Sequence, residues 1–327
     1  AIAPFGRHPI MLIPSAAPAS RGLSLSMRAA AWPLLVTPSW LSARAGHKDL
    51  VVLDCSWYLP SMKRNGLAEF DAEAIPGARF FDVDGTSAKG TGLPHMLPDA
   101  ASFEETMSSL GVGANSHVVC YDGAGIFSAP RAWWQLRAFG HEAVSVLDGG
   151  LPAWKAAGLA VTPGSSGPLA PPEGGPWKAQ DREPRLVKSL SDMRAIVDSK
   201  CADVRVVDAR SAGRFEGTAP EPRPELPSGH MPGSINLPFG DLLEPIGEGA
   251  AGTRFKREAE LQAAFASTGL DLDQPFVTTC GSGMTACIVA LGAAQLGNLK
   301  VSVFDGSWTE WASAEGTPIE AKQKGHK

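Results

Sequence analysis

The order of strand-like and helix-like segments repeats along this chain, and this repeat limits the possible folds more than any other feature. A β-branched run ending in an aspartate occurs at 50-LVVLD-54 and again at 204-VRVVD-208. A later pair, 117-HVVCYD-122 and 276-FVTTCG-281, runs in each copy into a glycine-containing turn and an apolar helix. Strands that alternate with helices in this order predict parallel sheets with helices on both faces. We therefore expect an α/β fold of two tandem domains.

The rest of each copy follows the same order. The expected helices lie at residues 101–112, 129–140, 256–270 and 285–297, and the last strands lie at 143–150 and 300–307. Between the copies, residues 163–184 are rich in Pro, Gly and Ser, which predicts a surface linker. We place the N-terminal domain at 32–162 and the C-terminal domain at 185–320, followed by a tail at 321–327.

The first 31 residues differ in composition from the rest of the chain. They hold several Arg, Ser and Ala and no acidic residue, and the first carboxylate of the whole chain is Asp49. This composition is typical of an organellar transit peptide. We therefore expect residues 1–31 to be a transit segment and the protein to be mitochondrial. The alternatives are a plastid or cytoplasmic location, or a disordered tail without a targeting role.

The bulk composition excludes several functional classes. The net charge of −5 gives no broad basic surface for nucleic acid. No run of 18 apolar residues occurs, so we expect no membrane span. The 5 cysteines are odd in number and scattered, which favours a reducing compartment over a disulfide framework. Neither CxxC nor HExxH occurs, so we expect no metal site.

Cys280 stands at a strand-to-helix turn that is rich in small residues. Gly281 and Gly283 give the turn backbone freedom, and such a turn can direct several N–H groups at one anion. The helix that follows adds the positive end of its dipole, and Thr285 is a candidate N-cap. We therefore expect an ionised, reactive sulfur that tolerates a second sulfur atom. Alignment of the copies puts Asp122 opposite Cys280, so only the second copy carries the thiol.

A single buried cysteine is more often a small apolar side chain than a functional one. We assign this structural role to Cys55, Cys120, Cys201 and Cys287. A turn of this kind could also bind phosphate, but tyrosine-phosphatase loops place an arginine six residues after the cysteine. Ala286 occupies that position here, so phosphatase chemistry is disfavoured.

Four blocks of sequence resemble the two-domain rhodanese-type sulfurtransferases: 54-DCSWYLP-60, 129-APRAWWQLRAFGH-141, 147-LDGGLPAW-154 and 305-DGSWTEW-311. The resemblance covers nearly all of residues 32–320 and implies two rhodanese-like domains. The loop 280-CGSGMTA-286 is similar to that of the mercaptopyruvate branch. The thiosulfate branch has Arg-Lys after the cysteine, where this chain has Gly281 and Ser282. Because thiosulfate is a dianion, it benefits more from cations in the loop.

The resemblance also implies roles for side chains outside the cysteine turn. Arg214 and Arg223, in 210-RSAGRFEGTAPEPRPE-225, match two arginines that bind the substrate carboxylate and keto oxygen. Glu216 departs from the basic or neutral residue expected there, which changes the local charge. Asp84 and His95 would form a proton relay with Ser282. His95 can equally be interpreted as a structural histidine. His230 is interpreted as a structural turn residue.

The activity implied by the resemblance is transfer of sulfane sulfur from 3-mercaptopyruvate through a persulfide on Cys280. The acceptor would be a thiol such as thioredoxin or glutathione, or cyanide, and pyruvate would be released. Gly281, Gly283, Met284 and Thr285 would bind substrate through the loop, and no cofactor or metal is needed. Thiosulfate sulfurtransferase activity is the first alternative. A non-catalytic module that only relays persulfide to a partner is the second.

Overall fold

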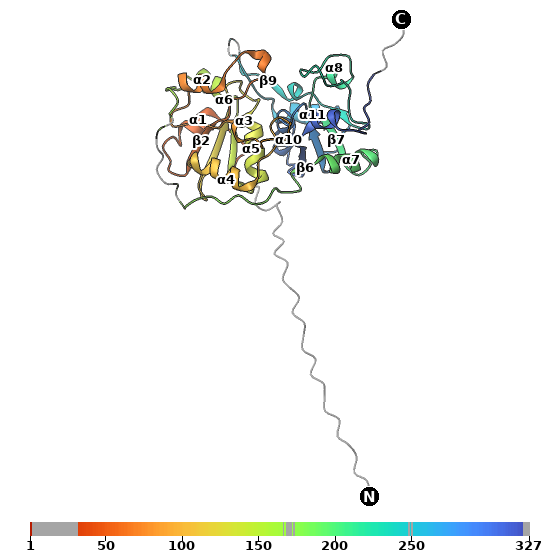
Figure 1. The fold of residues 1–327 in the computed structure, drawn as a ribbon. Coiled ribbons are helices and arrows are strands. Elements are labelled where there is room, and N and C mark those ends of the chain that lie inside the picture. Colours follow the sequence, from red (N-terminus) through yellow and green to blue (C-terminus); the bar gives the residue numbers. More distant parts are fainter. Residues whose placement is uncertain are drawn as a thin grey trace. The chain divides into compact units, whose positions relative to one another are not determined.

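Figure 1 shows the computed structural model of the chain. The structure describes residues 1, 32–165, 167, 172, 174–247, 249 and 251–322. The expected transit segment, apart from its first residue, therefore lies outside the described residues, as does most of the expected tail. From Trp32 onward the described residues form one compact unit.

The first half of this unit is built on a five-stranded sheet in which all neighbours are parallel. Its strands are β1 (Leu35–Val36), β2 (Leu50–Asp54), β3 (Arg79–Phe80), β4 (His117–Tyr121) and β5 (Val144–Leu147). They lie in the order β1-β5-β4-β2-β3. The central strand β4 is buried along its whole length, as expected for a parallel strand with helices on both sides.

Different helices cover the two faces of this sheet. Residues of α1 (Pro38–Ser42), α2 (Gly66–Ala72) and α6 (Gly150–Ala156) share one apolar core with Val119 and Tyr121 of β4. Residues of α4 (Ala100–Ser109) and α5 (Ala129–Ala138) share another core with Val118 and Cys120. This alternation along β4 is the two-residue period of a strand. A 3-10 turn, η2 (Pro60–Met62), and a short helix, α3 (Val83–Thr86), lie in the connections around β3.

The second half repeats the same architecture. Its sheet is again parallel and lies in the order β6-β12-β11-β7-β8. The strands are β6 (Val187–Lys188), β7 (Arg205–Asp208), β8 (Ile235–Asn236), β11 (Phe276–Thr279) and β12 (Val301–Phe304). The helices are α7 (Leu190–Asp198), α8 (Ala212–Phe215), α9 (Glu258–Ala266), α10 (Ala286–Gln295) and α11 (Ser307–Ser313). The expected α/β fold of two tandem parallel-sheet domains is confirmed.

One addition distinguishes the second half from the first. A 3-10 turn, η3 (Phe239–Leu242), leads into an antiparallel hairpin of β9 (Leu243–Pro245) and β10 (Thr253–Phe255). The hairpin contacts the first half, because the N–H of Thr253 donates to the carbonyl of Ala124 at 3.2 Å. Sequence analysis did not anticipate this hairpin.

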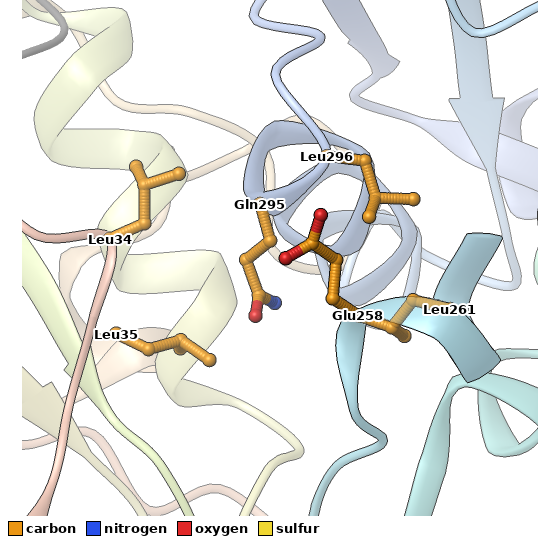
Figure 2. A pocket seen from close by; sticks show the side chains of 6 residues that line it. All are labelled: Leu34, Leu35, Glu258, Leu261, Gln295 and Leu296. Atoms are coloured by element: carbon orange, nitrogen blue, oxygen red, sulfur yellow. The ribbon is translucent and has the colours of Figure 1, made fainter.

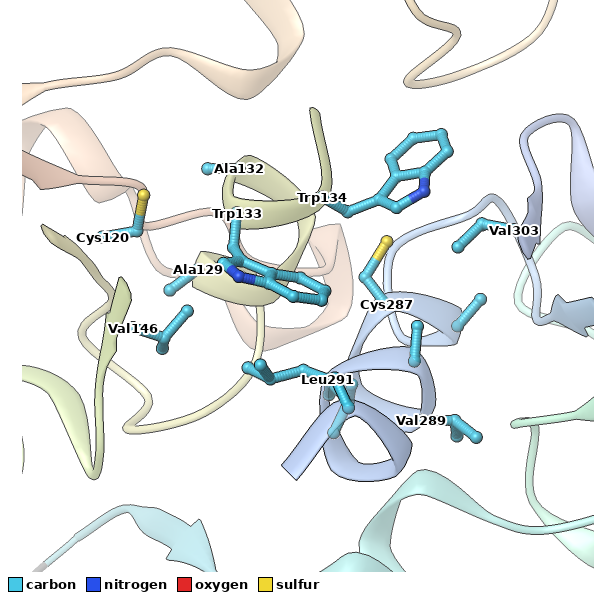
Figure 3. Packing of buried hydrophobic residues seen from close by; sticks show 14 of the residues in the cluster. Cys120, Ala129, Ala132, Trp133, Trp134, Val146, Cys287, Val289, Leu291 and Val303 are labelled. Carbon is cyan, nitrogen blue, oxygen red and sulfur yellow. The ribbon is translucent and has the colours of Figure 1, made fainter. Parts of the chain in front are cut away.

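Helices α5 and α10 join the two halves through one continuous apolar core (Figure 3). Every residue of α5 is buried, and so is every residue of α10 except Gln295. Trp133 and Trp134 of α5 lie beside Cys287 and Leu291 of α10 (Figure 3). A helix that is apolar around its whole circumference has to be buried on all sides, which explains the central position of α10. The seam between the halves is therefore part of the protein interior.

Candidate active site

Cys280 is the first residue after β11, at the carboxyl end of the second sheet, and α10 begins six residues later. Its backbone is fixed by α11: the N–H donates to Oγ of Ser307 at 3.1 Å, and the carbonyl accepts from the N–H of Trp308 at 2.9 Å. Cys280 is only 2% exposed and belongs to the main apolar core. Burial of this kind is equally typical of a structural cysteine. The surrounding loop is what distinguishes Cys280.

The backbone N–H groups of residues 281–285 have no hydrogen-bond acceptor within the described part of the protein. Gly283 adopts a left-handed φ of 78°, which a residue with a side chain rarely adopts. Thr285 occupies the N-cap position of α10, but its side chain makes no capping hydrogen bond, so that part of the expectation is wrong. Its φ and ψ of −76° and −15° are already helical, whereas a side-chain cap needs an extended residue.

The corresponding turn of the first domain shows what such a loop does with an anion. Asp122 follows β4 as Cys280 follows β11, and its carboxylate is completely buried. Oδ1 accepts the N–H of Ala124 at 2.9 Å, and Oδ2 accepts the N–H groups of Phe127, Ser128 and Ala129 at 2.9 Å each. Four N–H groups of this turn thus converge on one negative group. The first copy fills its turn with its own carboxylate.

Both expected substrate arginines reach the neighbourhood of Gly281. A Cβ on Gly281 would lie 3.0 Å from Nη2 of Arg214, and Nη1 of Arg223 lies 3.4 Å from Oγ1 of Thr309. That same Oγ1 donates to the Gly281 carbonyl at 2.7 Å. Two cations therefore lie beside the turn, next to Cys280.

Arg214 is held in place by a chain of alternating charges. Its Nε and Nη2 both donate to the carboxylate of Glu221, which also accepts from Nη1 of Arg210 at 2.8 Å. Arg210 in turn pairs with Asp208 at the end of β7. Arg210 and Glu221 are buried, so the chain orients Arg214 and leaves its Nη1 without a protein partner among the described residues. Glu216, the departure from the family pattern, pairs with Lys322 at 3.4 Å.

Two members of the expected relay lie together. Nδ1 of His95 is 2.9 Å from Oδ1 of Asp84, and Trp57 donates its indole N–H to Oδ2 of Asp84 at 2.8 Å. The His95 ring and the Trp57 N–H lower the pKa of the Asp84 carboxyl, against the opposing effect of burial. His95 itself is buried and has a left-handed φ of 59°. In the described part of the chain, no hydrogen bond joins His95 to Ser282.

Sequence reasoning missed three side chains that organise this region: Trp57, Arg131 and Glu221. Arg131 comes from α5 of the first domain and donates to the carbonyl of Gly283 in the cysteine turn at 3.2 Å. Its signal in the sequence was a cation inside the otherwise apolar segment 129-APRAWW-134. Trp57 and Glu221 lay inside segments quoted for other residues, and their partners come from other parts of the chain or from a folded loop.

The remaining cysteines and His230 have surroundings that suit structural roles. Burial raises the pKa of the Cys287 thiol, which donates to the Gly283 carbonyl at 3.2 Å, and burial also raises the pKa values of Cys55 and Cys201. Cys120 is completely buried. The His230 ring stacks on Phe215 at a centroid distance of 3.9 Å and bonds to the Phe215 carbonyl.

Three other kinds of feature would compete with the turn at Cys280 as a functional centre: a metal cluster, a membrane helix or a pocket. No cluster of His, Cys, Asp or Glu among the described residues could hold a metal ion, and none of the described helices is long and apolar enough to cross a membrane. A pocket of about 270 Å³ lies beside β1 and the end of α10 (Figure 2). It is lined by Leu34, Leu35, Glu258, Leu261, Gln295 and Leu296, and by none of the expected site residues.

Comparison with known proteins agrees with this geometry. The model of the rhodanese-like domain matches residues 37–157 and again residues 189–314. Human 3-mercaptopyruvate sulfurtransferase is 44% identical over 302 residues, which cover 89% of this chain and 97% of the human protein. Thiosulfate/3-mercaptopyruvate sulfurtransferase 1, mitochondrial, of Arabidopsis thaliana is 41% identical over 88% of this chain and 78% of its own length.

Among solved structures, the crystal structure of SseA from Escherichia coli, described as a 3-mercaptopyruvate sulfotransferase, superposes with a TM-score of 0.73 at 34% identity. The match covers 85% of this chain and 99% of SseA. Together with the twofold domain match, these similarities decide the family. The chain belongs to the rhodanese family of sulfurtransferases and carries two rhodanese-like domains in tandem.

Proposed function

We propose that this chain is an enzyme that transfers the sulfur of 3-mercaptopyruvate to a thiol or to cyanide through a persulfide on Cys280. One observation carries the proposal: Cys280 begins the turn after β11, and the N–H groups of residues 281–285 in that turn have no hydrogen-bond acceptor among the described residues. The names of the human and Arabidopsis relatives support the donor.

Substrate binding falls to the two arginines. A forked guanidinium can donate two parallel N–H bonds to a carboxylate, which a lysine cannot do. Glu221 accepts one N–H each from Nε and Nη2 of Arg214, so both N–H groups of Nη1 and the second N–H of Nη2 remain for the substrate. Arg223 offers the donors that Thr309 does not use. Because both arginines lie beside Gly281, the thiol of a bound mercaptopyruvate would be placed near Cys280.

The first chemical step needs no external oxidant or reductant. The thiolate of Cys280 attacks the sulfur of 3-mercaptopyruvate and forms an S–S bond. The C–S bond breaks, its electron pair goes to the carbon, and pyruvate leaves as its enolate, which takes up a proton. The N–H groups of Gly281, Ser282, Gly283, Met284 and Thr285 would stabilise the persulfide anion that remains.

A relay of Asp84, His95 and Ser282 would assist this step. Its role would be to polarise the substrate or to deliver the proton that the enolate takes up. Support comes from the close contact of Asp84 and His95, with Trp57 holding the other carboxylate oxygen.

The second step returns the enzyme to its starting state. The thiolate of an acceptor attacks the outer sulfur, a persulfide leaves on the acceptor, and the Cys280 thiolate is restored. Thioredoxin and glutathione are the acceptors we propose, and cyanide would leave as thiocyanate. We propose a mitochondrial location, on the composition of residues 1–31 and the mitochondrial relative in Arabidopsis.

Thiosulfate is the second candidate donor, because the Arabidopsis relative is named for both donors. The turn has Gly281 and Ser282 after the cysteine, so it lacks the cations that would suit a dianion. We therefore expect mercaptopyruvate to be the better donor. A non-catalytic persulfide relay remains the alternative from another class.

A comparison of donors tests these alternatives. The purified chain is assayed with 3-mercaptopyruvate and with thiosulfate, with cyanide as acceptor, and Cys280→Ser serves as the matched variant. We expect faster turnover with mercaptopyruvate, pyruvate in equal amount to the sulfur transferred, and one added sulfur atom on Cys280 by mass spectrometry. Turnover retained by a folded Cys280→Ser variant would refute the mechanism. An added sulfur atom on Cys280 without release of pyruvate would favour the non-catalytic persulfide relay module.

A further inference from the structure

Arg131 belongs to the first domain, yet its side chain lies under the cysteine turn of the second. It is a residue of α5 and its side chain is completely buried. Nη2 donates to Oδ1 of Asp305 at 2.7 Å and also to the carbonyl of His95. Nη1 donates to the carbonyl of Gly283 at 3.2 Å. One guanidinium thus contacts the cysteine turn, the end of β12 and the segment that carries the expected relay histidine.

Asp305 completes the connection between the two halves. Its second oxygen, Oδ2, accepts the N–H of Leu97 from the first domain at 2.8 Å. The carboxylate therefore binds the first domain through both oxygens, once through a side chain and once through the backbone. A buried ion pair with additional hydrogen bonds on both partners has a defined geometry, and removal of one partner leaves an unpaired buried charge.

The fit at Gly283 is close. A Cβ on Gly283 would lie 2.7 Å from Nη1 of Arg131 and 2.6 Å from the carbonyl oxygen of Asp305. Because a trans peptide is planar, the carbonyl of Gly283 and the N–H of Met284 point in opposite directions. The hydrogen bond from Arg131 to that carbonyl therefore also sets the direction of one of the unbonded N–H groups of the turn.

The guanidinium is a permanent positive charge in this place. Burial alone would lower the pKa of Arg131, but the carboxylate of Asp305 raises it above its usual value. No described residue accepts from its buried Nε. A desolvated charge with one unmet donor is expensive to keep, which argues for a role other than stability.

We propose that Arg131 is a positioning residue for sulfur transfer: it fixes the turn that surrounds Cys280 and the segment of His95 relative to each other across the domain seam. Arg131 does not touch the substrate. This inference rests on the proposed function, and it assigns to the first domain a direct part in organising the anion-binding turn of the second.

The test replaces Arg131 and, as a matched control, Arg137. Arg137 is on the same helix, is also buried and lies over the ring of Trp133, 4.9 Å from its centroid, but among the described residues no hydrogen bond joins its side chain to the cysteine turn. We expect Arg131→Met to lower kcat about 100-fold, because a turn misplaced by about 1 Å costs that much. KM for mercaptopyruvate should stay within about threefold, since Arg214 and Arg223 are unchanged. Arg137→Met should keep kcat within about threefold.

A second variant covers the case in which Arg131→Met does not fold. Asp305→Asn keeps the volume and removes the charge of the partner, and we expect a fall in kcat of about tenfold with little change in KM. Equal losses of kcat in folded Arg131→Met and Arg137→Met would refute the inference. So would a folded Arg131→Met or Asp305→Asn variant with kcat within about threefold of the wild type.

The rate of alkylation of Cys280 by iodoacetamide separates this inference from the proposed function, because alkylation needs no sulfur donor. If the wild type does not turn over mercaptopyruvate, the proposed function fails by itself. In that case Arg131→Met should still alkylate about tenfold more slowly than the wild type and Arg137→Met. An alkylation rate unchanged in Arg131→Met would overturn the positioning role.

Discussion

The buried carboxylate of Asp122 allows a direct test of how a turn of this kind holds an anion. Asp122→Asn keeps the shape of the side chain and removes its charge, whereas Asp122→Ala removes all acceptor atoms. Asp71→Asn, on the exposed side of α2, is the matched control for loss of one carboxylate. The measured quantity is the free energy of unfolding in urea.

The magnitude follows from the four N–H groups that bind Asp122. In Asp122→Asn the amide oxygen can replace Oδ2 and keep three bonds, but the amide NH₂ then faces the N–H of Ala124. Loss of the acceptor of this partly buried N–H costs toward the lower end of about 1–3 kcal/mol, and the three other bonds lose the strengthening effect of charge. We expect a loss of about 3 kcal/mol for Asp122→Asn and about 4 kcal/mol or more for Asp122→Ala.

Asp122→Ala also allows a second measurement, because removal of the carboxylate should leave an empty anion site that an added anion can fill. Inorganic sulfate should stabilise Asp122→Ala more than the wild type, and at ten times its Kd the difference should be about 1.4 kcal/mol. Asp71→Asn should change stability by less than about 0.5 kcal/mol. A loss below about 1 kcal/mol for Asp122→Asn would show that the four N–H groups do not depend on the carboxylate, and the reasoning would fail.

Two further predictions concern specificity and pH. Ser282→Lys should shift the ratio of turnover with the two donors toward thiosulfate, because a cation beside Cys280 favours the dianion. The measurement is the steady-state rate with each donor, and an unchanged ratio would contradict the prediction. Burial lowers the pKa of His117 to about 4. Between this pKa and the ordinary value of about 6.5, the unfolded state binds a proton at His117 that the folded state does not bind. The free energy of unfolding should therefore fall as the pH drops from about 6.5 to 4. His117→Gln should reduce this loss by about 1–2 kcal/mol in denaturation measured at both pH values, and equal losses would refute the assignment.

The sequence predicted the parts of the fold that depend on local pattern. The strands at 50–54, 117–121 and 276–279 are apolar runs of ordinary length, and the helix expected at 285–297 is present as α10, Ala286–Gln295. The edge strands β1 and β6 have two residues each and pair with β5 and β12, respectively. Two residues are too few to show the alternation of apolar and polar residues that predicts a strand. The hairpin of β9 and β10 was missed because it is held in part by the first domain.

In the candidate site, too, some features could be predicted from the sequence and others could not. The turn at Cys280 could be predicted, because small residues between a strand and a helix have a defined consequence for N–H direction. The contacts of Arg131 and the charge chain through Glu221 could not, because they join segments more than thirty residues apart or depend on the path of a folded loop. The repeat placed Asp122 opposite Cys280, but only the three-dimensional structure shows its carboxylate bound by the turn.

The packing of α5 against α10 has a consequence for dissecting the molecule. A fragment cut within residues 163–184 would expose one of these two helices to water on a face that carries tryptophans or aliphatic side chains. Exposed apolar patches of this size promote aggregation, so each fragment expressed alone should be poorly soluble. We therefore expect that the copy without a thiol cannot be removed without loss of solubility of the other copy, although it carries no reactive cysteine of its own.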